Sequence, residues 1–140
     1  MIQITKDEEE TLELAAAFAG TLETGSVVAL FGELGSGKTV FARGIARALG
    51  ITEIITSPTF TLIHEFQSSI PLYHMDLYRM DSIREIRDIG VEDYFYGDVI
   101  CVVEWAGKLG ELFPENAICV RLKHLGDTNR EIEIERPEKP

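Results

Sequence analysis

One stretch of the sequence, residues 27–39, restricts the possible folds more than any other. It begins with an apolar run from Val27 to Phe31, rich in the residue types of strands that are buried on both faces. The next eight residues, Gly32 to Thr39, fit the pattern G-x-x-x-x-G-K-[ST], and apolar residues at helical spacing, Phe41 and Ile45, follow them. The order strand, glycine-rich turn, helix predicts an α/β fold with a phosphate-binding loop at the carboxyl end of a central strand.

The residue types of this loop suit a nucleoside triphosphate. Glycines let the backbone bend so that successive N–H groups point inward, and the following helix adds its free N–H groups and the positive end of its dipole. The lysine can reach the β- and γ-phosphates, and the threonine hydroxyl can bind Mg²⁺. We therefore predict that the nucleotide contacts the whole loop: Gly32, Glu33, Leu34, Gly35, Ser36, Gly37, Lys38 and Thr39.

The rest of the chain alternates strand and helix patterns and then becomes rich in strands. A capping-box pattern, Thr5 to Glu8, predicts that Thr5 caps the first helix. We expect one domain over residues 1–135, a P-loop NTPase-like α/β sandwich whose mixed, mostly parallel sheet is flanked by helices, and a frayed tail at 136–140. The expected strands are 2–4, 27–31, 62–66, 72–75, 99–103, 117–122 and 132–135, and the expected helices are 6–22, 40–49, 81–96 with a break at Gly90, and 108–112.

A phosphate-binding loop needs an acidic partner at a neighbouring strand end, which holds Mg²⁺ directly or through water. Two residues qualify. Glu104 closes the most apolar strand outside the loop strand, and Asp76 closes a shorter, more polar one. The residues themselves leave both possibilities open. His74 lacks a second His or Cys that would make a metal set with it, so we treat it as a structural histidine.

Composition restricts the partners and the compartment. The formal net charge of −11 argues against a dedicated nucleic-acid surface, which is basic. No segment approaches the ~20 apolar residues of a membrane span, and the N-terminus lacks the layout of a signal peptide. Cys101 and Cys119 lie in apolar runs, as reduced core cysteines do. We expect a cytoplasmic protein that binds no membrane and no tRNA by itself.

Several blocks of the sequence, taken together, resemble a known family. They are the loop at 32–39, Ser57 to Leu62, His74 to Arg79, Gly90 before Glu92-Asp93-Tyr94, and Glu104-Trp105. These blocks are similar to those of the TsaE (YjeE) family, small bacterial P-loop ATPases of tRNA threonylcarbamoyladenosine biosynthesis. The resemblance covers about residues 5 to 135, and the Ser-Pro-Thr-Phe and His-x-Asp-x-Tyr-Arg blocks are its most specific parts.

The resemblance implies roles for individual residues. It makes Lys38 a phosphate-binding and catalytic residue, and it assigns Mg²⁺ to Thr39 and Glu104. Asp76 takes the family's Walker-B-like position, so Asp76 and Glu104 are both expected to be catalytic. The implied cofactors are ATP and Mg²⁺.

The resemblance also brings in residues outside the loop and the two strand ends. Residues 57–61 match the family's switch-like loop, so Thr59 is expected to contact the nucleotide. Arg130 matches an arginine near the nucleotide. One departure is that residues 84–87, Arg-Glu-Ile-Arg, are more basic than the family's leucine-rich form. The implied partners are TsaB and TsaD. TsaD installs the threonylcarbamoyl group on the adenosine beside the anticodon.

Three other functions fit a phosphate-binding loop. A small-molecule kinase needs an acceptor pocket and usually a mobile, arginine-bearing lid, and no insertion here is long enough for one. A guanine-reading GTPase carries an Asn-Lys-x-Asp segment, which this sequence lacks. A nucleotide-sensing module that does not hydrolyse ATP is the alternative outside the enzymes.

Overall fold

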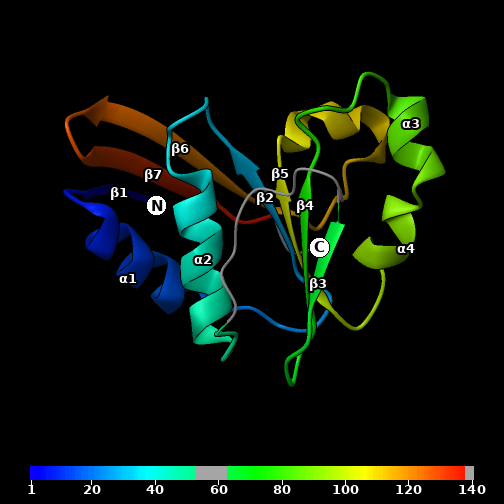
Figure 1. Cartoon of the computed structure of the whole chain (residues 1–140), viewed down its shortest axis with the longest axis horizontal. Coiled ribbons are helices and arrows are strands. Elements are labelled where there is room, and N and C mark those ends of the chain that lie inside the picture. The colour runs from blue at the N-terminus through cyan, green and yellow to red at the C-terminus, as the bar shows by residue number, and fades with distance from the viewer. Residues whose placement is uncertain (53–62, 138–140) are drawn as a thin grey trace.

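The structure is a computed structural model that describes residues 1–52 and 63–137. Within this part of the chain, seven strands form one sheet in the order β1-β7-β6-β2-β5-β4-β3 (Figure 1). The loop strand, β2, is therefore central, as the sequence predicts. The strands are β1 Ile2–Thr5, β2 Val27–Phe31, β3 Ile63–Phe66, β4 Leu72–Asp76, β5 Ile100–Glu104, β6 Ile118–Gly126 and β7 Asn129–Glu135.

The sheet is mixed, with a parallel centre and antiparallel edges. β2 pairs in parallel with β5 and with β6, and β4 pairs in parallel with β5. β7 runs antiparallel to β6 and to β1, and β3 runs antiparallel to β4. It follows that β1, β6, β2, β5 and β4 all point the same way, while β7 and β3 are reversed. This confirms the predicted mixed, mostly parallel sheet.

Helices cover both faces of the sheet. α1 and α2 lie over one face, and α3, α4 and the 3₁₀ helix η1 lie over the other (Figure 1). Because successive strand residues point to opposite faces, Val28 and Leu30 of β2 contact the first layer, while Val27 and Ala29 contact the second. The helices are α1 Glu8–Ala19, α2 Lys38–Ala48, α3 Ile83–Asp88, α4 Val91–Phe95 and η1 Ala106–Leu112.

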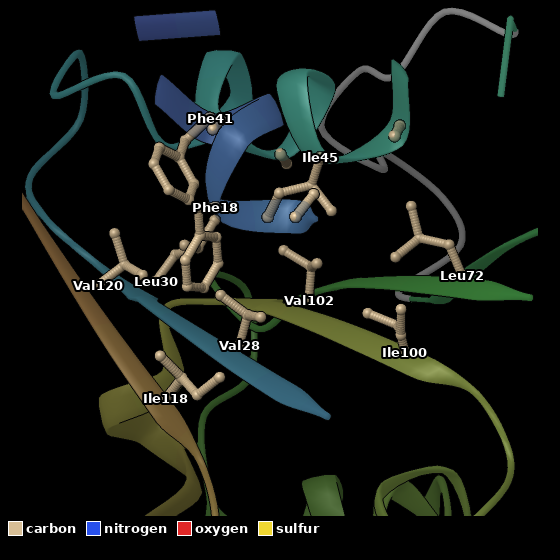
Figure 2. Packing of buried hydrophobic residues seen from close by; sticks show 14 of the residues in the cluster. Phe18, Val28, Leu30, Phe41, Ile45, Leu72, Ile100, Val102, Ile118 and Val120 are labelled. Carbon is tan, nitrogen blue, oxygen red and sulfur yellow. The ribbon is translucent and has the colours of Figure 1, made fainter. Parts of the chain in front are cut away.

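The core under α2 fixes the helix that begins at the loop. Phe41 and Ile45 point from α2 toward Val28 and Val102 of the sheet, and Phe18 of α1 lies between the two layers (Figure 2). The rings of Phe18 and Phe41 lie 5.7 Å apart. α1 also approaches α2 closely, since a Cβ added at Gly44 would lie 2.6 Å from the Ala15 Cβ. α2 is thus held both from below and from the side.

The predicted cap of the first helix is wrong by two residues. Asp7 is the N-cap, and its Oδ1 accepts the Glu10 N–H at 2.8 Å. Thr5 instead ends β1, where it pairs with Arg130, and its hydroxyl hydrogen-bonds the Thr11 hydroxyl. Pairing with β7 keeps Thr5 in the strand. A capping-box pattern considers neighbouring residues alone, so it cannot predict this pairing with a distant segment.

The predicted tail begins at Arg136, whose guanidinium donates to Thr21 Oγ1 at 2.5 Å and lies over the Phe18 ring. Residues 138–140 lie outside the described residues, and the domain boundary stays a prediction. No helix among the described residues has the length and apolarity needed to cross a bilayer.

Candidate functional site

The loop between β2 and α2 has the predicted strand–turn–helix setting. Gly32 has φ +153 and Gly37, at the N-cap of α2, has φ +104, conformations that side-chain-bearing residues rarely adopt. A Cβ at Gly32 would lie 2.4 Å from Ser36 Oγ and 2.7 Å from the Leu122 carbonyl oxygen. Glycine at this position is therefore required for the loop to close over the end of β2.

The loop side chains divide into exposed and buried ones. The exposed part of the loop is residues 33–35, and Leu34 is 72% exposed. Ser36 and Lys38 are buried beneath it. The Ser36 hydroxyl finds no hydrogen-bond partner in the part of the chain that the structure describes. Because an unpaired buried hydroxyl costs free energy, this loop suits a ligand that brings polar atoms of its own, as a phosphate chain does.

Lys38 folds back onto the loop. Its ammonium donates to the carbonyl oxygen of Gly32 at 2.5 Å and to that of Glu33 at 2.9 Å. It also lies 4.4 Å from the centroid of the Trp105 ring. Burial lowers the pKa of Lys38, while the negative charges of Glu104, Asp76 and Glu33 act in the opposite direction. A bound phosphate would replace these carbonyl contacts with stronger, charge-assisted ones.

The two acidic candidates lie side by side. Asp76 and Glu104 are register partners at the carboxyl ends of β4 and β5. Glu104 is 2% exposed, and its Oε1 accepts the Thr39 hydroxyl at 3.4 Å. Asp76 is partly exposed, and its Oδ1 accepts the Tyr78 N–H at 3.0 Å. Burial raises the pKa of Asp76, which the Tyr78 N–H partly offsets.

These residues fit Mg²⁺ of the kind that arrives with a nucleotide. Such an ion takes one or two protein oxygens and fills its remaining positions with phosphate oxygens and water. The Thr39 hydroxyl and the Glu104 carboxylate already meet, and Asp76 stands at the matching position of the next strand. Among the described residues, no group of three or more His, Cys, Asp or Glu side chains is arranged to hold a metal alone.

His74 is part of this site, and the sequence analysis missed it. Its Nε2 lies 2.5 Å from Glu104 Oε2, and the residue is fully buried. The signal that was available is strand alternation, which places His74 on the same face of β4 as Asp76. Glu104 is the register partner of Asp76, so its side chain shares that face.

Arg130 lies beside the loop although it comes from β7, which is separated from β2 by β6, and its contact with a nucleotide stays a prediction. A Cβ added at Gly37 would lie 3.6 Å from Arg130 Nε. A cavity of about 110 Å³ opens between α1, the start of α2 and β7. Its lining includes Gly37, Val40, Thr128 and Arg130, together with Asp7, Glu8 and Thr11 of the first helical segment.

The sequence of this chain matches a known protein family over most of its length. A model of the family described as "Threonylcarbamoyl adenosine biosynthesis protein TsaE" matches residues 5–132. The chain belongs to the TsaE family. The resemblance recognised from the sequence blocks is thereby confirmed.

Individual relatives agree with this assignment. The tRNA threonylcarbamoyladenosine biosynthesis protein TsaE of Bacillus subtilis is 45% identical over 129 residues, 91% of this chain and 80% of that protein. The protein of the same name from Treponema pallidum is 41% identical, over 94% of this chain and 97% of its own. A crystal structure of Bacillus subtilis YdiB superposes with a TM-score of 0.85 at 38% identity, covering 99% of this chain and 86% of that one.

Two residues of this TsaE-family chain complete the description. Thr59, with the predicted switch-like segment 57–61, lies outside the described residues, so its role stays a prediction. Trp105, which directly follows Glu104, has a left-handed backbone with φ 60. Its ring lies 5.0 Å from that of Tyr78. Such a conformation is strained for a bulky residue, and here it accompanies the placement of the indole against the Lys38 ammonium.

Proposed function

We propose that this chain is a Mg²⁺-dependent, ATP-binding and ATP-hydrolysing accessory protein of tRNA threonylcarbamoyladenosine formation at the adenosine beside the anticodon. The pathway follows from membership of the TsaE family and from the names of its relatives. The chemistry rests on one observation in particular. The hydroxyl that ends the phosphate-binding loop, from Thr39, contacts the buried carboxylate of Glu104 at the end of the neighbouring strand.

Each residue of the site has a part in this function. The loop N–H groups and Lys38 bind the phosphates, and Lys38 exchanges the carbonyl oxygens of Gly32 and Glu33 for phosphate oxygens. Thr39 and Glu104 hold Mg²⁺, which neutralises charge on the β- and γ-phosphates when it is bound. Asp76 stands beside Glu104 and is partly exposed, so it can orient a water molecule toward the γ-phosphate.

We infer that hydrolysis is slow in the isolated chain and depends on protein partners, TsaB and TsaD. Phosphoryl transfer needs cations around the γ-phosphate, and P-loop enzymes that receive an arginine from a partner gain about 10³–10⁵ in rate. Two cations of this chain lie at the loop: Lys38 contacts the Gly32 carbonyl oxygen, and the Arg130 side chain lies beside Gly37. The net charge of −11 leaves tRNA binding to the partners.

Single-turnover hydrolysis of radiolabelled ATP tests the proposal. Four samples are compared: the chain alone, the chain with TsaB and TsaD, the chain with tRNA, and the Lys38→Ala variant with TsaB and TsaD. We expect fast release of free phosphate only in the second sample. Fast hydrolysis by the isolated chain, or stimulation by tRNA without protein partners, would contradict the proposal. Conversion of ATP to ADP without free phosphate would indicate a kinase, and ATP binding without turnover in every sample would indicate a nucleotide sensor.

A further inference from the structure

The Glu104 carboxylate is held from both sides by side chains of different elements. Thr39, at the start of α2, donates its hydroxyl to Oε1 at 3.4 Å. His74, in the middle of β4, lies 2.5 Å from Oε2. Since an ionised carboxylate can only accept hydrogen bonds, the Nε2–H of His74 is the donor. The side chains of His74 and Glu104 are 1% and 3% exposed, so water reaches neither of them appreciably.

Within the described residues, the hydrogen bond to Glu104 is the polar contact that the structure gives the His74 ring. Its second ring nitrogen, Nδ1, is buried without a hydrogen-bond partner among residues 1–52 and 63–137. On the same face of β4, Leu72 belongs to the apolar core under α2, and Val102, the register partner of His74, belongs to that core too. An apolar side chain would therefore suit this position by its surroundings. A polar ring here leaves one nitrogen without a partner in the described part of the chain, which costs free energy, while its other nitrogen bonds Glu104.

We propose that His74 is a positioning residue for the metal site. By binding Oε2, it fixes the rotation of the Glu104 carboxylate so that Oε1 faces Thr39 before nucleotide and Mg²⁺ arrive. This inference rests on the proposed function, because it assigns the metal to Thr39 and Glu104. The physical reason is preorganisation: a ligand that is already oriented loses less conformational freedom when the metal binds. Outer partners of this kind typically contribute about 10- to 100-fold to metal affinity or activity.

Three variants separate positioning from a merely structural role. His74→Leu removes the donor, and His74→Gln restores an N–H that can reach the carboxylate. His64→Gln makes the same change at the register partner of His74 on β3, which contacts Phe66 rather than Glu104. Each variant is saturated with a non-hydrolysable ATP analogue and titrated with Mn²⁺ at constant pH, with free Mn²⁺ followed by electron paramagnetic resonance. Affinity for the analogue without metal is measured separately by calorimetry.

We expect His74→Leu to weaken Mn²⁺ binding about 10- to 100-fold and metal-free analogue binding less than about threefold, with most of the loss restored in His74→Gln. The His64→Gln variant should match the wild type. Wild-type Mn²⁺ affinity in folded His74→Leu, or equal losses in folded His74→Leu and His74→Gln, would overturn the inference and leave the proposed function standing. A wild-type chain that binds neither analogue nor Mn²⁺ would overturn both.

A measurement on the wild-type chain covers the case in which the variants do not fold. The chain has three histidines, so ring ¹⁵N–¹H spectra are simple to assign, and His64 and His124 act as internal controls. We expect the His74 Nε2–H signal to be protected from solvent exchange and to shift when Mg²⁺ is added to the analogue complex at constant pH. The signals of the other two rings should stay in place. A His74 signal that exchanges freely, or that ignores Mg²⁺ while the analogue complex binds it, contradicts the positioning role.

Discussion

The carboxyl ends of β4 and β5 lie side by side, yet the carboxylates they carry have different surroundings. Glu104, on β5, is buried and has a side-chain partner on each oxygen, Thr39 and His74. Asp76, its register partner on β4, is partly exposed and accepts a backbone N–H from Tyr78. The difference shows that two equivalent strand ends can place their carboxylates in unlike surroundings. The proposed assignment of the metal to Glu104 rests on the side chains that fix its carboxylate, because strand position alone does not separate it from Asp76.

The largest effect should follow from neutralising the buried member of the pair. Glu104→Gln keeps the shape and still accepts the His74 N–H through its amide oxygen, but it removes the charge that Mg²⁺ requires. We expect the Mg²⁺ dependence of analogue binding to weaken by more than the roughly 10- to 100-fold that is typical of an outer-shell partner. Calorimetric titrations with and without Mg²⁺ measure this, and affinity without metal should change little. Unaltered Mg²⁺ dependence would show that Glu104 does not hold the metal.

Lys38→Ala should come next, because it removes the cation that contacts the loop and interacts electrostatically with Glu104 and Asp76. A charge-assisted hydrogen bond is worth about 1.5–3 kcal/mol, so we expect a roughly ten- to hundredfold loss in affinity for the ATP analogue. The fluorescence of Trp105, the one tryptophan in the chain, reports binding because its ring lies against the Lys38 ammonium. Lys123→Ala, a change at an exposed position on β6, serves as the control. Equal affinities in the two folded variants would rule out the proposed role of Lys38.

A smaller effect on the metal is expected from Asp76→Asn. Asp76 Oδ1 is engaged by the Tyr78 N–H, whereas the Thr39 hydroxyl donates to Glu104. Mg²⁺ affinity in the analogue complex should therefore fall by less than about tenfold, while the hydrolysis rate with partners falls more, since Asp76 acts on the water. The two readouts come from the same Mn²⁺ titration and single-turnover assays. A loss of Mg²⁺ dependence in Asp76→Asn, with Glu104→Gln unaffected, would exchange the roles of the two residues.

The smallest effect concerns stability and pH. Burial raises the pKa of Asp76 above its unfolded value of 3.8, so the folded chain retains a proton that the unfolded chain releases first. As pH rises from 3.8 through the folded pKa, the Asp76 carboxyl ionises in the folded chain, and the free energy of unfolding falls. This cost of a partly buried negative charge is present in full at neutral pH. Asp76→Asn removes the penalty. Urea unfolding measures the free energy of unfolding of Asp76→Asn minus that of the wild type. We expect this difference to be more favourable to the variant at pH 7 than at pH 4. A relative loss at pH 7 would contradict it.

The sequence predicts best where the chemistry is local. The apolar runs of β2 and β5 need burial on both faces, and the spacing of Gly32, Gly37 and Lys38 needs a strand before it and a helix after it. These requirements fix the central strands, the loop and the mostly parallel sheet. The positions of Glu104 and Asp76 at strand ends are predicted in the same way, because each closes an expected strand, and the structure makes the two residues register partners.

Features that depend on pairing between distant segments escape such reasoning. His74 becomes informative only once β4 lies beside β5 and Glu104 is its neighbour. Thr5 reads as a helix cap until β7 pairs with it. The left-handed backbone of Trp105 has no sequence signature, because tryptophan rarely adopts it. In the structure it occurs together with contacts of the ring to Tyr78 and Lys38.

A crystal structure of the chain with a non-hydrolysable ATP analogue and Mg²⁺ tests the central claim most directly. The account predicts the analogue's phosphates in the loop at 32–39 and Mg²⁺ bound by the Thr39 hydroxyl and Glu104 Oε1, with His74 still on Oε2. It predicts Lys38 on the phosphates, away from the carbonyl oxygens of its own loop. Mg²⁺ bound directly by Asp76, with the Glu104 carboxylate outside the coordination shell, would contradict the assignment of the metal site.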